Sequence, residues 1–164
     1  MDANSNNYIQ LNDNEDLLVL KIRDKSGKET GEELVFNLED IELPLRYQEI
    51  IEEDKKARAN LRNQILIIEK KQDHKGKKLW SSNEEAKIKA MRDFYKREEE
   101  IYNMFLGENG VKKLLNGGNL SWSSLEMIDE IIEKQIMPKI ETNATDIKTK
   151  IMKKYSKKED DVIE

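Results

Sequence analysis

Two long stretches of the sequence, residues 44–72 and 82–106, carry apolar side chains at the spacing of an α-helix. In the first stretch they recur mostly at steps of three, four or seven, from Leu43 to Ile68. In the second they are Ile88, Met91, Tyr95, Tyr102 and Phe105. These steps place side chains on one face of a helix. Because a short connection joins the two stretches, we expect two long, antiparallel helices packed side by side.

The charge of the chain agrees with long, exposed helices. Charged residues make up 38% of the 164 residues, whereas Gly and Pro together number nine. Cysteine is absent, which excludes disulfides and Cys-ligated metals. The single histidine, His74, follows a Lys-rich run and is predicted to be an exposed surface residue. We therefore predict no catalytic residue, no cofactor and no metal site. A net charge of −5 also argues against nucleic-acid binding.

A short β-hairpin is predicted at residues 17–37. Residues 17–23 alternate apolar and charged side chains from Val19 onward, which is typical of a half-buried strand. A second strand is expected at residues 33–37, after a loop of about nine residues that is long for a hairpin. Because a two-stranded ribbon is marginal alone, its apolar face should dock on the helices.

The remaining pattern predicts a short helix at Val111–Leu115 and a final amphipathic helix that Ser121 or Ser123 caps. Pro138 is expected to kink or restart this last helix. Ser82 and Glu85 are predicted to form a capping box for the second long helix, and Ser123 to Glu126 another for the final helix. The fold class is therefore mostly α with a small N-terminal β-hairpin, with long antiparallel helices and a C-terminal helical segment. We expect a disordered tail at 1–14, one domain at 15–152 and a frayed, charged tail at 153–164.

Two acidic runs, 52–54 and 98–100, could in principle supply paired carboxylates. Di-metal helical bundles need Glu-x-x-His pairs that face inward, and the sequence has none. We interpret both runs as solvated helix faces. The basic stretch 70–78 is interpreted in the same way, as a solvated linker rather than a phosphate site.

Aromatic and large apolar residues are dense between residues 94 and 127. They form either the core of the domain or a groove for a partner helix, since Met and aromatic side chains adapt to varied apolar surfaces. If the region binds a partner, the candidate contact residues are Phe105, Leu106, Leu114, Leu115 and Trp122.

The order of these elements resembles that of the tail assembly chaperones of long-tailed bacteriophages and related phage-tail-like particles. Residues 104–107, Met-Phe-Leu-Gly, close a long charged helix, and a short helix and the amphipathic segment 123–132 follow. Upstream, residues 35–40 form an apolar–acidic stretch that leads into the segment 43–47, which contains an aromatic residue. The resemblance covers roughly residues 17–140.

The resemblance implies a non-enzymatic protein that binds the apolar helices of the tape-measure protein and keeps it soluble. It also implies help in recruiting tail tube subunits, a place in the cytoplasm of the bacterial host and absence from the mature particle. Because no apolar run approaches the ~18 residues needed to span a bilayer, no membrane role is expected. The alternative is a structural or regulatory helical protein that self-associates and has no client. A carboxylate enzyme and a nucleic-acid factor are weaker alternatives.

Overall fold

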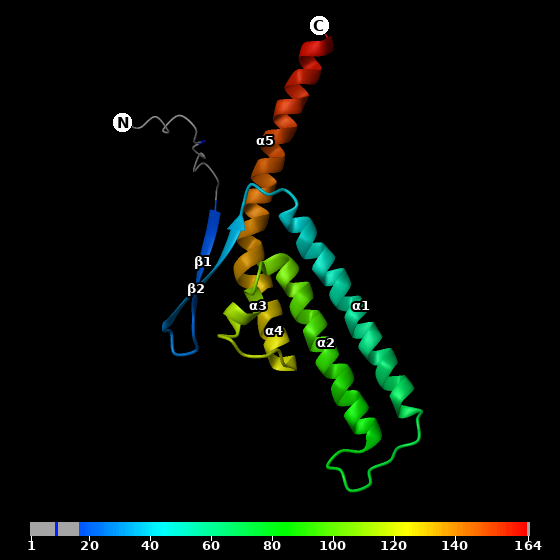
Figure 1. Cartoon of the computed structure of the whole chain (residues 1–164). Helices are drawn as coiled ribbons and strands as arrows, with labels where there is room; N and C mark the ends of the chain where they lie inside the picture. The colour runs from blue at the N-terminus through cyan, green and yellow to red at the C-terminus, as the bar shows by residue number, and fades with distance from the viewer. Residues whose placement is uncertain (1–8, 10–16, 164) are drawn as a thin grey trace, which may run out of the picture.

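The computed structural model describes residue 9 and residues 17–163, with side chains at all of these except 144, 147 and 157–163. Its elements are β1 (Leu17–Arg23), β2 (Glu29–Asn37), α1 (Leu43–Glu69), α2 (Ser82–Leu106), α3 (Gly110–Leu114), α4 (Trp122–Ile131), the π-helix η2 (Ile132–Ile136) and α5 (Met137–Ile163). The predicted class, mostly α with an N-terminal hairpin, is confirmed (Figure 1). The tail predicted at 1–14 lies outside the described residues, except for residue 9.

The two strands pair antiparallel, with Leu20 opposite Leu34. The connection is shorter than predicted, because β2 already begins at Glu29. The Asp24 carboxylate closes this tight turn by accepting hydrogen bonds from the backbone N–H groups of Ser26 (2.9 Å) and Lys28 (3.0 Å). Gly27 takes the positive φ of 85° that the turn requires. The hairpin turns its apolar face, including Leu34, to the helices, as expected.

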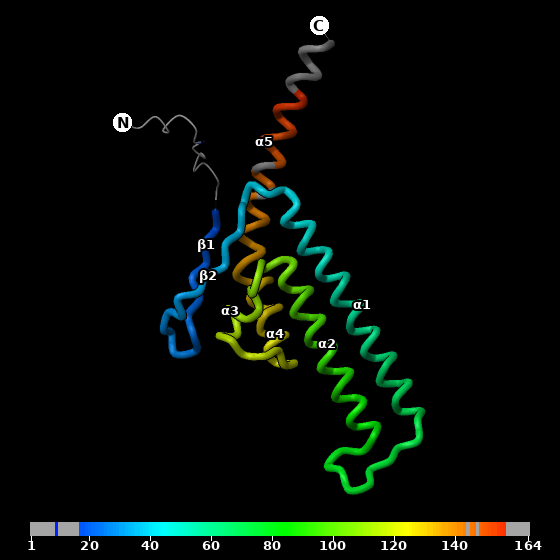
Figure 2. Tube along the Cα trace, viewed as in Figure 1, coloured from blue at the N-terminus to red at the C-terminus, as the bar shows by residue number. Residues whose placement is uncertain are grey.

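Helices α1 and α2 lie side by side and run antiparallel, as the traces in Figures 1 and 2 show. Pro44 lies in the first turn of α1, as predicted. The capping box of α2 is one residue earlier than predicted, and that assignment was wrong. The Ser81 hydroxyl accepts a hydrogen bond from the N–H of Glu84 (3.1 Å), and the Glu84 carboxylate accepts one from the N–H of Ser81 (2.8 Å).

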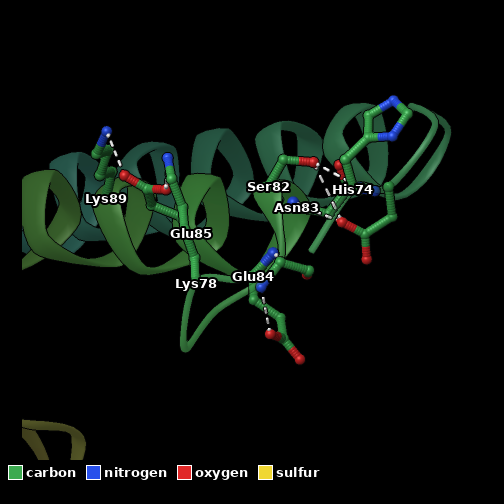
Figure 3. A network of polar contacts seen from close by, with 9 residues as sticks. His74, Lys78, Ser82, Asn83, Glu84, Glu85 and Lys89 are labelled. Atoms are coloured by element: carbon green, nitrogen blue, oxygen red, sulfur yellow. Dashed lines mark hydrogen bonds and ion pairs between the residues drawn. The ribbon is translucent and has the colours of Figure 1, made fainter. Parts of the chain in front are cut away.

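Ser82 instead forms hydrogen bonds to the loop that connects the two long helices. Its hydroxyl accepts a hydrogen bond from the backbone N–H of His74 (3.0 Å) and donates one to the Asp73 carboxylate (3.2 Å) (Figure 3). His74 is exposed, as predicted. The first helix ends at Glu69, slightly before the predicted end at 72, because the chain leaves the helix there and enters the loop that Ser82 stabilises.

The C-terminal helices form one continuous rod. Ser121 caps α4, and its partner in the capping box is Ser124, so the predicted box from Ser123 to Glu126 was wrong. The helix then widens into the π-turn η2 just before Pro138. A π-turn re-routes backbone hydrogen bonds, which suits a proline that has no N–H to donate. The helical backbone continues past residue 152, where we expected a frayed tail, to Ile163.

One apolar core joins all of these elements. The α4–α5 rod contributes a stripe of almost fully buried residues: Leu125, Ile128, Ile132, Ile136 and Ile140. The Phe105 ring of α2 lies 5.4 Å from the Phe36 ring of β2 and 5.6 Å from the Tyr47 ring of α1, between ring centroids. Among the described residues, no helix has both the length and the apolar character to cross a membrane.

Candidate functional site

The apolar stripe of α2 is buried along only half of the helix. Tyr102 and Phe105, in the C-terminal half, are 3% and 4% exposed. Ile88 and Met91, on the same stripe in the N-terminal half, are 46% and 38% exposed. The C-terminal rod begins with α4 beside the C-terminal half of α2, so it covers only that half (Figure 1). The other half is left open.

The open half of the stripe forms the floor of a groove of about 480 Å³, which we call the α2 groove. Its second wall is the loop that precedes α4. The groove is lined by Ile88, Met91, Arg92, Tyr95, Lys96, Glu99, Asn119 and Leu120. Charged side chains therefore surround an apolar floor.

The loop wall of the groove is held in place by a lysine. The Lys112 ammonium donates hydrogen bonds to the carbonyl oxygen of Gly118 (3.1 Å) and to the side-chain oxygen of Asn119 (2.8 Å). Gly117 supplies a positive φ of 82° where the chain turns after α3. These contacts fix Leu120 opposite α2. An apolar floor with a methionine, an aromatic and a charged rim suits the apolar face of an amphipathic helix.

Glu98 lies on the same stripe, at the point where it passes from open to buried. The residue has no exposed surface, and neither carboxylate oxygen has a hydrogen-bond partner. Burial and the nearby Asp54 carboxylate raise the pKa of Glu98 from near 4.5 to about 9, against the opposing pull of Arg58. Glu98 is therefore neutral at pH 7. Our interpretation of the run 98–100 as a solvated face was wrong for Glu98.

Arg58 of α1 links Asp54, which lies near the buried acid, to α4. Its guanidinium donates to both oxygens of Asp54, at 2.9 and 3.0 Å, and stands 3.8 Å from the Asp129 carboxylate. The same guanidinium carbon lies 4.9 Å from the ring centroid of Trp122, a cation–π distance. This group of polar side chains therefore holds α4 against the two long helices.

Tyr102 makes the second polar link to α4, since its hydroxyl donates to Asp129. Burial and the nearby acids raise the pKa of Tyr102, and burial also raises the pKa of Asp129. A substrate could reach Glu98 only if the helices separated, because the carboxylate is closed to solvent. Within the described residues, no three acidic, His or Cys side chains are grouped so that they could hold a metal ion.

The five residues predicted to bind a partner do not form one surface. Phe105 and Leu106 are core residues, 4% and 3% exposed, so a partner could reach them only if the core opened. Leu114 and Leu115 are partly buried and pack against the core. Trp122 is 48% exposed, beneath Arg58.

Sequence analysis did not single out the α2 groove as a site. Ile88, Met91 and Tyr95 were recognised as a helical stripe, but helical spacing does not show how much of a stripe is covered. Leu120 had no signal, since its place depends on how the loop folds.

We compared the chain with models of protein families, with curated proteins and with solved structures, and none of the three comparisons finds a match. The function is therefore proposed from the geometry, the residues and the resemblance in element order.

Proposed function

We propose that this protein is a tail assembly chaperone, which binds apolar helical segments of a tape-measure protein in the bacterial cytoplasm and keeps them soluble. It acts without catalysis and helps tail tube assembly. The observation that supports this proposal best is the α2 groove. Its floor is made of apolar side chains that the protein's own core leaves uncovered.

The groove suits a client that is apolar on one face of a helix. Ile88, Met91 and Leu120 would be removed from water by such a face, and each Å² of apolar surface buried contributes roughly 25 cal/mol. The unbranched Met91 side chain can adjust to different client side chains. Arg92, Lys96 and Glu99 carry both signs of charge around the rim, so they can meet polar residues of either sign at the client's edges.

Co-expression with a tape-measure fragment tests the proposal. The test variant is the double substitution Ile88→Asp and Met91→Asp, which places two charges on the floor of the groove. The matched control is Leu66→Asp on α1, because Leu66 is also a half-exposed helical residue, at 49%. We expect the fragment to be soluble and to co-purify with the wild-type protein and the control, and to be lost with the double variant.

Two outcomes would count against this function. The first is a client whose solubility is unchanged by the wild-type protein. The second is evidence for a structural helical protein that has no client. Such evidence would be detection of the protein in purified particles, or self-association that the double variant abolishes.

A further inference from the structure

A second uncovered surface lies on α5, where this helix passes the start of α1 and continues beyond it (Figure 1). Residues 145–156 of α5 extend beyond the other helices (Figures 1 and 2). Met152 and Tyr155 are 62% and 63% exposed on this segment, and Ile151 is 38% exposed. Isolated helical turns are marginal in water, so an exposed apolar face on a projecting helix is best explained by a partner that covers it.

This face is hollowed where it meets the start of α1. The groove there, which we call the α5 groove, has a volume of about 510 Å³. It is lined by Ile41, Pro44, Glu141, Thr145, Lys148, Ile151 and Met152. On α5, Glu141, Thr145, Lys148 and Met152 follow one another at steps of four, three and four, so they form one line along the helix, with Ile151 beside it. A shallower hollow continues the line to Lys153 and Ser156.

The charge of this surface is opposite to that of the whole chain. Residues 145–156 contain four lysines and one acid, Asp146, in a protein whose net charge is −5. Lys148 lines the groove itself, Lys153 lines the shallower hollow that continues it, and Lys150 and Lys154 are exposed on other faces of the same helical turns. Glu141 marks the other end, two helical turns from Lys148, or about 10 Å at 1.5 Å per residue. The groove therefore has an apolar lining between Glu141 at its inner end and the lysines Lys148 and Lys153 at its outer end.

We propose that the α5 groove binds an amphipathic helix of a partner protein, whose apolar stripe fills the groove and whose carboxylates face Lys148 and the neighbouring lysines. Charge complementarity selects this partner, because the same apolar stripe flanked by lysines would place like charges together. The surface is separate from the α2 groove, so this inference is independent of the proposed function.

Two other occupants fit the surface less well. A second copy in a two-fold contact would present the same patch to itself, and lysine would then face lysine. An anionic membrane would attract the lysines. However, a flat surface does not enter a groove whose wall is made by Ile41 and Pro44 of another element.

Fluorescence anisotropy with two labelled helical peptides tests the inference on the full chain. Both peptides have the same leucine stripe. One is flanked by glutamates and the other by lysines. We expect the acidic peptide to bind about tenfold more tightly than the basic peptide. Its binding should weaken as salt is added.

The variants separate charge from apolar contact. Lys148→Glu should lower the affinity for the acidic peptide by about tenfold. It should also reduce the difference in affinity between the acidic and the basic peptide. Because Lys148 lies at the surface, this change should leave the fold intact, which far-UV circular dichroism checks. Met152→Asp should lower the affinity for both peptides. Lys70→Glu, the same charge change at the far end of α1, is the matched control and should change neither affinity.

Several results would overturn the inference. Equal binding of the two peptides would remove the role of charge. Binding to phosphatidylglycerol vesicles that Lys148→Glu abolishes, without selective peptide binding, would identify a membrane surface. Dimerisation that Met152→Asp abolishes would identify a second copy. The double Asp variant of the α2 groove should bind the acidic peptide normally, so a failure here and a failure of the proposed function are distinguishable.

Discussion

The two halves of α2 carry one apolar stripe in two different surroundings. In the C-terminal half the stripe meets β2, α1 and the C-terminal rod, and Phe105 is almost completely buried. In the N-terminal half the same face meets only a loop, and Met91 stays 38% exposed. Helical spacing sets which face of a helix is apolar. The places where the neighbouring elements begin and end decide how much of that face becomes core.

The largest difference between the halves should appear in stability. Phe105→Ala removes a ring that contacts the Phe36 and Tyr47 rings, and it leaves a cavity between three elements. We expect a loss of about 3–5 kcal/mol in the free energy of unfolding. Urea denaturation followed by far-UV circular dichroism measures this loss. A cost below about 1 kcal/mol would mean that this half is not the core.

The sequence was sufficient to predict most of the fold and little of the site. The stripes of α1, α2 and α4 carry strong periodicity, and β1 alternates cleanly, so these elements were predicted correctly. The early start of β2 was missed because it depends on side-chain hydrogen bonds of Asp24. The burial of Glu98 was missed because a carboxylate on a charged helix is normally solvated. Its burial depends on how α1 and α4 pack around it, since Asp54 and Arg58 of α1 and Asp129 of α4 all lie near its carboxyl.

The boundary between the halves should be sensitive to pH. Glu98 has a pKa of about 9 in the folded protein and an ordinary value near 4.5 when unfolded. Below pH 4.5 both states are protonated, and the neutral acid contributes its full stability. Between 4.5 and 9 only the folded state holds the proton, so this contribution falls as pH rises, with a limiting slope of about 1.4 kcal/mol per pH unit.

Glu98→Gln keeps the shape of the neutral acid and cannot ionise. We expect the stability of this variant relative to the wild type to rise by on the order of 2 kcal/mol between pH 6 and pH 8. Chemical denaturation at several pH values measures this difference in the free energy of unfolding. Glu100→Gln is the matched control, since Glu100 is exposed on the same helix, and it should show no such trend. A constant gap for Glu98→Gln would mean that Glu98 is ionised in the fold.

The start of the open half depends on a cap rather than on a core. Ser81→Ala removes the hydroxyl that accepts the N–H of Glu84 and should cost about 1 kcal/mol. Ser82→Ala removes only exposed contacts to the connecting loop and should cost less. Thermal denaturation of the two variants compares them directly. The reverse order would place the cap at Ser82, one residue further along α2.

The smallest expected effect is the one that defines the open half. Ile88→Ala and Met91→Ala remove side chains that are 46% and 38% exposed, so little buried surface and no closed cavity are lost. Alanine is also a better helix former than either residue. We therefore expect each variant to change the free energy of unfolding by less than about 0.5 kcal/mol, measured by urea denaturation. A cost near that of Phe105→Ala would show that something in the free protein already covers the stripe. A small cost combined with weaker client binding would mean that the stripe is kept for a partner, because the fold itself does not need it.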